Sequence, residues 1–431
     1  MTQAGMARDG AVEAVVADTH RREWARVLAA TVRVARDLDL AEECVQEAYA
    51  AALRAWPAAG IPANPAAWLT ATAKRRAIDA IRRDATRRSA FPLLVIRKRA
   101  ADQAASTGPA AADGADPGDV VPDERLRLIF TCCHPALPQE AQVALTLRLV
   151  CGVPTADIAR AFLVSEPTVA ARITRAKKKI ATARIPYRVP GPDELAERLS
   201  PVLAVIHLLF TTGHTAPSGT SLLRADLVDS AMHLARMLHD LMPGQTEVSG
   251  LLALLLVTDA RRATRADAAG HPLQLKDQDR SRWDHAALSE AHDMIVGCLR
   301  AGPPGRYVLQ AAIASLYAEA PSYDQTDWTQ IVALYDRLLA AWPSPVVALN
   351  RAVPLAMTRG AQAALAEVEA LEQDGRLSGY RYLYAVKADL LSRTGRTADA
   401  AAAYRQAFAL AANEAERAFL AGQIAEHSLP G

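Results

Sequence analysis

Positive charge is most concentrated in residues 74–99, which hold ten Lys or Arg residues and two Asp residues. So many charges of one sign repel one another unless an anionic partner neutralises them, and phosphate groups are the usual partner. A helical stripe of apolar residues runs through the start of this segment, at Ala73, Ala77, Ile78 and Ile81. We therefore expect a helix that buries this stripe and turns a basic face outward. That face carries Lys74, Arg75, Arg82 and Arg83, with Trp68 at the start of the helix.

A second basic element spans residues 155–180. It reads as a short helix, a turn and a second helix, for which Ser165 is a good N-cap and Pro167 is tolerated in the first turn. The second helix is expected to bury Val169, Ile173, Ala176 and Ile180. Polar or basic residues elsewhere on it are Thr168, Arg172, Arg175, Lys177, Lys178 and Lys179. This pattern predicts a helix-turn-helix whose second helix enters the major groove of DNA, and the alternative is a helical hairpin with a basic face.

Residues 39–49 predict an acidic amphipathic helix ahead of both basic elements. Leu40, Cys44, Ala48 and Ala52 recur every four residues on one face. Glu43, Gln46 and Glu47 lie on the other side of the helix. This outer side is either an ordinary solvated face or a docking surface for a basic partner.

Cys132, Cys133 and His134 are adjacent and invite a zinc interpretation. Zinc needs four ligands at workable spacing, and the chain has no second pair of cysteines. We therefore expect buried packing here instead of a metal site. The sequence also has no Gly-rich phosphate loop, no Ser or Cys nucleophile motif and no HExxH motif, so we expect no catalysis and no cofactor.

The composition favours helices as the elements that position these residues. Hydrophobic residues make up 51% of the 431 residues and aromatic residues only 5%, and alanine is abundant. The apolar runs Leu203 to Phe210 and Leu251 to Val257 are too short to span a bilayer, and no signal peptide is readable. An odd number of cysteines, five, argues against a disulfide framework. We expect an all-α protein of the reducing cytoplasm that does not bind membranes.

Charge divides the chain into two unlike parts. Residues 1–188 carry 28 Lys+Arg against 20 Asp+Glu, whereas residues 189–431 carry 21 against 27. An anionic partner is therefore expected for the first part only. Between the two DNA-binding candidates, residues 100–122 are rich in Ala, Gly, Pro and Asp, which is the composition of a flexible linker.

The end of the chain shows a helical repeat. Gly395, Ala400, Tyr404 and Ala407 have the offsets of a tetratricopeptide hairpin, and Tyr384, Ala388 and Leu391 fit its first helix. Tyr335, Leu338 and Pro343 match the second helix two periods earlier. We expect tetratricopeptide-like helices here, and the alternative is an ordinary helical bundle.

The whole pattern resembles a bacterial RNA polymerase sigma factor of the extracytoplasmic-function type. The resemblance rests on residues 41–47, on Trp68-Leu69 with residues 75–83, and on Asp157-Ile-Ala with residues 168–177. Residues 123–137 and 277–284 further resemble a subgroup that has a long helical, tetratricopeptide-like C-terminal extension. Two residues depart from the pattern: Arg75 stands where the family usually has Asn, and Leu163 where a helix-turn-helix usually has Gly.

This resemblance implies a role for each group of candidate residues. Sigma region 2, at residues 10–92, would dock on the β′ clamp helices of core RNA polymerase through Glu43, Gln46 and Glu47. It would hold the −10 element of promoter DNA with Trp68, Lys74, Arg75, Arg82 and Arg83. Sigma region 4, at residues 123–187, would lie near the β flap and read the −35 element with Thr168, Arg172 and Arg175, while Lys177, Lys178 and Lys179 contact phosphates.

The remaining parts of the chain follow from the same resemblance. Residues 93–122 would be the flexible linker, and residues 188–431 a regulatory helical extension that takes a protein or peptide partner. Two other classes stay open from the sequence. One is a helix-turn-helix regulator with a tetratricopeptide sensor domain, which has no need of the residue 39–83 block. The other is an enzyme with a DNA-binding head, which would need a nucleophile or metal constellation that the sequence lacks.

Overall fold

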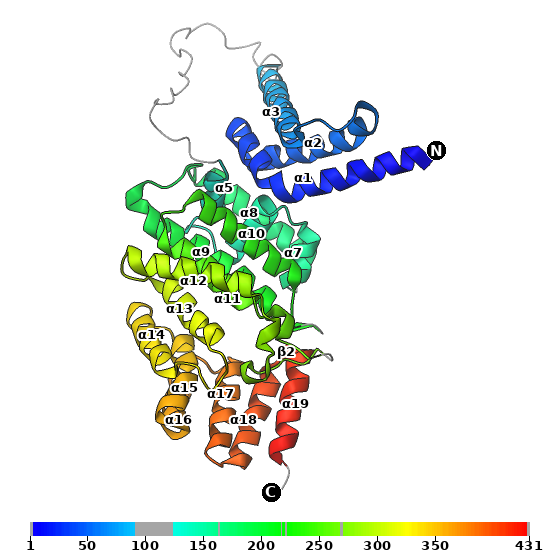
Figure 1. Ribbon diagram of the computed structural model, residues 1–431. Coiled ribbons are helices and arrows are strands. Elements are labelled where there is room, and N and C mark those ends of the chain that lie inside the picture. Colours follow the sequence, from blue (N-terminus) through cyan, green and yellow to red (C-terminus); the bar gives the residue numbers. More distant parts are fainter. Residues whose placement is uncertain are drawn as a thin grey trace. The chain divides into compact units, whose positions relative to one another are not determined.

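The computed structural model describes residues 3–90, 124–162, 164–216, 218–219, 222–267 and 270–428. The chain divides into two compact units, Met1–Val205 and Ile206–Gly431. The predicted linker at residues 93–122 lies outside the described residues, as does Leu163. The described part is almost entirely helical (Figure 1), which confirms the predicted all-α class.

Three long helices form the first part of unit 1. They are α1 (Gln3–Ala35), α2 (Leu38–Ala59) and α3 (Pro65–Ala90), and each packs against the other two. Their shared core includes Leu28, Val45, Trp56 and Leu69, none of which is more than 2% exposed. Burial of apolar side chains from three helices makes this a stable platform for the polar residues on its outer faces.

The second part of unit 1 contains shorter helices. They are α5 (Glu124–Cys132), α6 (Gln139–Leu145), the π-helical turn η1 (Thr146–Val150), α7 (Thr155–Phe162) and α8 (Glu166–Thr182). This part packs against the first, because α1 contacts both α5 and η1. The indole Nε1 of Trp24 donates to the carbonyl of Leu149 over 3.0 Å, and the Tyr187 hydroxyl donates to the carbonyl of Ala29 over 3.2 Å.

Helix α9 (Pro192–His214) runs across the boundary between the units. Of the helices in the described ranges, it is the one that is long and apolar enough, by length and composition, to cross a membrane. A buried core helix passes the same test, and 39% of the apolar stretch of α9 is buried, Val202, Val205 and Leu209 included.

Unit 2 continues with helices that pack on their neighbours in chain order, from green to red in Figure 1. Its α-helices after α9 are α10 (Ala225–Leu241), α11 (Thr246–Asp259), α12 (His285–Ala301), α13 (Arg306–Glu319), α14 (Trp328–Ala341), α15 (Pro345–Arg359), α16 (Ala361–Asp374), α17 (Arg381–Arg393), α18 (Thr397–Leu410) and α19 (Glu414–Ser428). Short 3-10 helices η2 (Arg262–Thr264), η3 (Leu275–Asp277) and η4 (Arg280–Arg282) lie between α11 and α12. Strands β1 (Ser218–Gly219) and β2 (Ala412–Asn413) pair in parallel, with Ser218 opposite Ala412.

The residues that suggested the last helical repeat occupy a hairpin of unit 2, whereas Tyr335 and Leu338 lie on α14. Gly395 has a φ of 78° in the turn between α17 and α18, a conformation that glycine adopts without steric cost. Ala400 and Ala407 are fully buried, and Tyr404 is buried one turn after Ala400. The helical nature of the C-terminal region is thus confirmed, while its assignment to the tetratricopeptide class stays a prediction.

Candidate nucleic-acid interface

Helix α2 presents the acidic face that the sequence predicted. Asp37 caps its N-terminus by accepting a hydrogen bond from the amide of Leu40 over 2.8 Å. Cys44, Ala48 and Ala52 are buried against the rest of unit 1, which leaves the opposite side of the helix in solvent. Glu43, Gln46 and Glu47 are all exposed there. Their predicted outward placement is confirmed, whereas their role in docking stays a prediction.

Two of these exposed side chains already have partners within the protein. The carboxylate of Glu47 pairs with Arg76 of α3, and the Gln46 amide donates to Glu42 over 3.1 Å. The exposed pair of Glu47 with Arg76 contributes little stability, about 0–1 kcal/mol, so a binding partner can replace it at low cost.

Helix α3 carries the first basic surface. The side chain of Asn64 caps the helix through the amide of Ala67, at 3.0 Å. Trp68 is half-buried, and its ring meets that of Trp56 edge to face at a centroid distance of 5.5 Å. Lys74 is half-buried, and Arg75, Arg82 and Arg83 are exposed. The helix therefore brings all five predicted −10 residues to accessible or partly accessible positions.

The predicted buried stripe of α3 is wrong at two of its four positions. Ala73 and Ala77 are fully buried, but Ile78 is 39% exposed and Ile81 is 40% exposed. The helix packs through the row Leu69, Ala73 and Ala77, in steps of four residues, and Ile78 lies about 100° around the helix from Ala77. Ile81 continues the same row beyond the point where it is covered. Exposed isoleucines beside arginines make a surface that is both apolar and cationic, which suits unpaired bases and their phosphates.

Helices α7 and α8 form the predicted helix-turn-helix. The Ser165 hydroxyl accepts from the amide of Thr168 over 3.3 Å, so Ser165 is the N-cap as expected. Val169, Ile173, Ala176 and Ile180 are buried, as predicted. Thr168 is half-buried, and Arg175, Lys178 and Lys179 are exposed. Arg172 is half-buried and pairs with Glu140 of α6 over 3.0 Å, so its guanidinium is held near the N-terminal half of α8.

Lys177 is placed differently from the two lysines that follow it. Its side chain is only 8% exposed, and its Nζ lies 2.6 Å from Oδ1 of Asp39 and 2.8 Å from Oε2 of Glu42. Glu42 also pairs with Arg148 of η1. The expectation that Lys177 lies on the outer face with Lys178 and Lys179 is therefore wrong in this conformation, because α2 covers its ammonium group. A signal was present in the sequence: Lys177 stands four residues after Ile173 and three before Ile180, which is a core position of the helix.

The electrostatics of Lys177 favour its charged form. Burial by itself lowers the pKa of a lysine, but the hydrogen bonds to Asp39 and Glu42 outweigh it and raise the pKa of Lys177 above its ordinary value. The ammonium group is thus charged and fully engaged at neutral pH. It joins the acidic helix α2 to the DNA-recognition helix α8.

Cys132 and Cys133 are buried in the second part of unit 1. The Sγ atom of Cys133 lies 3.3 Å from the Thr146 hydroxyl, and burial raises the pKa of the Cys133 thiol to about 12. His134 accepts a hydrogen bond at Nδ1 from the amide of Ala136, 3.1 Å away. Over the described ranges of the chain, no group of three or more His, Cys, Asp or Glu residues is placed to hold a metal ion.

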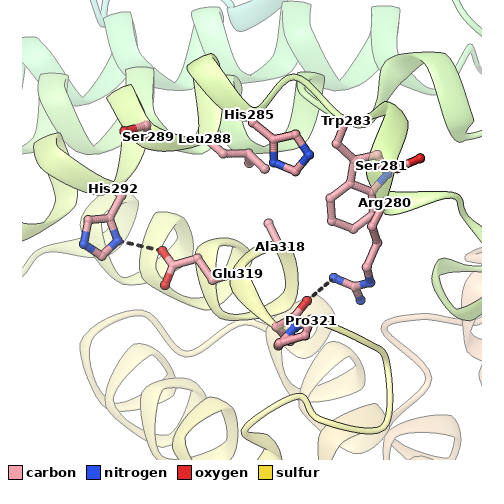
Figure 2. A pocket seen from close by; sticks show the side chains of 11 residues that line it. Arg280, Ser281, Trp283, His285, Leu288, Ser289, His292, Ala318, Glu319 and Pro321 are labelled. Atoms are coloured by element: carbon pink, nitrogen blue, oxygen red, sulfur yellow. Dashed lines mark hydrogen bonds and ion pairs between the residues drawn. The ribbon is translucent and has the colours of Figure 1, made fainter.

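The C-terminal motif at residues 277–284 shapes a loop in unit 2. Asp279 caps η4 and Asp284 caps α12. Arg280 donates from Nη1 to the carbonyls of Tyr317 and Ala320, both at 2.9 Å, and Figure 2 shows it reaching toward the end of α13. Its guanidinium also lies over the Trp283 ring, 4.6 Å from the centroid. These contacts fasten the loop before α12 to the C-terminal end of α13, so the motif has a structural role.

Comparisons with known proteins match most of the chain. Residues 20–87 match the family model described as sigma-70 region 2, and residues 127–180 match the one described as sigma-70, region 4. Residues 198–298 match a family of unknown function (DUF6596). An uncharacterized protein of Rhizobium meliloti (strain 1021) is 43% identical over 399 residues, which cover 93% of this chain and 92% of that protein.

Proposed function

Because the chain belongs to the sigma-70 family as a sigma factor with a C-terminal extension, we propose that it directs transcription initiation as a member of the extracytoplasmic-function group. Sigma-70 regions 2 and 4 bind core RNA polymerase and promoter DNA. The polymerase core supplies the chemistry, and this chain supplies promoter choice in the cytoplasm without catalysis of its own.

One observation supports this function most strongly, the combination of an acidic exposed face and two basic ones in unit 1. Glu43, Gln46 and Glu47 on α2 suit the β′ clamp helices, while α3 and α8 carry the cationic surfaces. A simple helix-turn-helix regulator has no use for the residue 39–83 block, which the match to sigma-70 region 2 covers. The proposed division is α3 on the −10 element, and α8 on the −35 element near the β flap.

Lys177 adds a conformational step to this proposal. Its ammonium group is engaged by Asp39 and Glu42 of α2, so it reaches a phosphate only after α8 separates from α2. Polymerase binding would drive this separation by covering α2. The conformation described here is then that of the factor before it binds polymerase.

Co-elution with core polymerase tests the docking surface. Glu43→Lys together with Glu47→Lys should abolish co-elution, because both carboxylates are exposed and their reversal costs the fold within about 0.5 kcal/mol. Glu13→Lys, at an exposed carboxylate of α1, is the matched control and should leave co-elution intact. Co-elution of the doubly reversed protein would contradict the assignment of α2.

We also propose that the C-terminal unit regulates the sigma domains. Residues 189–431 are net acidic, and a tethered acidic domain reaches the basic surfaces at high effective concentration. Stacked helices further offer a surface for a protein or peptide partner. A cut after Val205 is preferable to one near Arg188, because Arg198 donates to the Phe130 carbonyl over 2.9 Å within unit 1.

The truncated chain separates the two kinds of regulation. Higher transcription than from the full chain means inhibition by the C-terminal unit, and lost transcription with folded sigma domains means that the unit is required. Equal transcription, equal affinity for core polymerase and an equal response in cells would contradict a regulatory role.

A further inference from the structure

Unit 2 contains a cavity of about 540 Å³ between α9, α11, α13, α14 and α15. That volume lies within the range of about 300–1,000 Å³ that is typical of small-molecule sites. The cavity lies outside the sigma domains, and the proposed promoter recognition makes no use of it.

Two half-buried arginines, Arg261 and Arg306, line the cavity. Arg261 follows α11 and Arg306 begins α13, and the Nε of each is inaccessible to solvent without a hydrogen-bond partner in the described structure. No Asp or Glu is among the described residues that line the cavity. By contrast, Arg351 of the same unit pairs with Asp336 and Glu367.

Aromatic rings support both guanidinium groups without satisfying their hydrogen bonds. The guanidinium carbon of Arg306 lies 3.3 Å from the centroid of the Trp342 ring, and that of Arg261 lies 5.9 Å from the centroid of Trp283. A guanidinium that lies over a ring keeps the N–H groups at its edge available to an anion.

Burial of these cations costs free energy. The carboxylate of Glu247 offsets part of that cost at Arg306, whereas at Arg261 no described carboxylate is among the charges that act on its pKa. Burial, together with the nearby charges of Arg265 and Arg280, lowers the pKa of Arg261 to about 10, and burial also lowers the pKa of Arg306. Both groups remain charged at neutral pH. At Arg261, a partly buried charge without a carboxylate counter-charge is the condition that an incoming anion relieves.

The other walls of the cavity fit an apolar ligand body. Tyr317, Tyr335, Leu338 and Trp342 provide aromatic and aliphatic surface, and Gln310 and Asn350 provide amides. A second cavity, of about 460 Å³, shares Leu275, Tyr317, Tyr335 and Asn350, so the space continues beyond the first cavity. An inorganic anion would leave most of this surface unused.

We propose that this cavity binds a small organic carboxylate, whose charged group pairs with Arg261 and Arg306 and whose apolar body lies among Tyr335, Leu338 and Trp342. Guanidinium groups and carboxylates match in charge and geometry, and such charge-assisted hydrogen bonds are strong. This binding does not depend on the regulatory role proposed for unit 2.

Calorimetric titration of the full chain tests the proposal. The probes are the straight-chain carboxylates from butanoate to decanoate and 3-phenylpropanoate, each compared with its uncharged amide and with inorganic phosphate. At least one carboxylate should bind at millimolar concentration or below, and more tightly than both its amide and phosphate. The proposal is overturned if no carboxylate binds, or if amide or phosphate binds equally well.

Variants then show where on the protein the carboxylate binds. Arg261→Met and Arg306→Met should each weaken binding of the responding carboxylate about 10- to 100-fold, because each removes one charge-assisted contact. Arg337→Met is the matched control, since it removes an exposed arginine of α14 outside the cavity, and it should leave the affinity unchanged. The two arginines lie on different elements, so failure of one variant to fold leaves the other informative. Equal weakening by Arg337→Met would assign binding to another place.

Discussion

Lys177 lies between two carboxylates of α2, and its replacement probes the contact between α2 and α8 directly. Lys177→Met keeps the aliphatic stem but leaves Asp39 and Glu42 without its ammonium group. We expect the free energy of unfolding of unit 1 to fall by about 1–3 kcal/mol, since Arg148 still pairs with Glu42. Lys178→Met, at an exposed position, should change it by no more than about 0.5 kcal/mol. Urea unfolding measures both, and equal effects would mean that Lys177 is not engaged in solution.

The same residue gives a pH dependence of known sign. The folded pKa of Lys177 is raised above its ordinary value of 10.5. Its contribution to stability is therefore complete below that value and is lost as the pH rises through the raised folded pKa. Neutral solutions should leave the Lys177 contact intact.

His214 predicts an acid sensitivity of unit 2. Burial, with the charges of Arg265 and Arg261, lowers its pKa from 6.5 to about 3. The unfolded chain takes up the proton first, so the stability contributed by the neutral ring is present above pH 6.5 and is lost as the pH falls toward the folded pKa. At about pH 5 the loss is about 2 kcal/mol.

Thermal melts at neutral pH and at about pH 5 check this value. His214→Gln should reduce the difference in melting temperature between these two pH values. His285→Gln, at an exposed histidine, should leave that difference unchanged. An unchanged difference in the His214 variant would show that other groups set the acid sensitivity.

At the scale of the helix, α8 separates two kinds of DNA contact. Arg172 lies near the end that would enter the groove, and Lys178 is exposed further along the helix. Arg172→Ala should change the sequence preference at the −35 element, at a cost of about 1–3 kcal/mol. Lys178→Ala should weaken binding about equally on all sequences and flatten its salt dependence. Binding sites selected from a randomised −35 element by the holoenzyme of each variant distinguish a changed preference from uniform weakening. An unaltered preference in the Arg172 variant would contradict the placement of Arg172 in the groove.

Some features of the helices could be predicted from the sequence and others could not. The stripe of α8 and its Ser165 cap followed from spacing and from local hydrogen-bond chemistry, and both are present. The outward face of α2 followed in the same way. Periodicity alone does not show how much of α3 is covered by the neighbouring helices. For this reason Ile78 and Ile81 are predicted in the core although they are exposed. The predicted exposure of Lys177 is wrong because it rests on the residue type alone. The spacing of Lys177 from Ile173 and Ile180 is that of a core residue.

At the scale of the molecule, the two parts of unit 1 are in close contact at Gly152. This residue has a φ of 70°, and an added Cβ would lie 2.9 Å from Cε1 of His20 and 3.0 Å from Cγ of Trp24. Gly152→Ala should therefore lower the free energy of unfolding of unit 1 by about 1–3 kcal/mol. Gly10→Ala, where nothing lies within 4 Å, is the control. Equal unfolding midpoints for the two variants in urea would mean that α1 and residue 152 are not in contact.

Such long-range contacts could not be read from the sequence. The helical composition was enough to predict the fold class, and the resemblance of residues 41–47, 68–83 and 157–177 to sigma factors predicted the sigma domains. The ion pairs between α8 and α2, and the pairing of β1 with β2, join residues far apart in the chain. The lack of a hydrogen-bond partner at Nε of Arg261 and of Arg306 likewise depends on the side chains that surround them. No local sequence pattern indicates this.

We expect this chain to give core RNA polymerase its choice of promoter. Run-off transcription on fragments of its own genome, with core polymerase and the purified full chain, measures this role. Transcripts should arise from a limited set of start sites that appear only when the chain is added. These start sites should share sequence at the −35 and −10 positions, and they should vanish when Glu43 and Glu47 are reversed to Lys. Transcripts that are the same with and without the chain would show that the chain does not direct promoter choice.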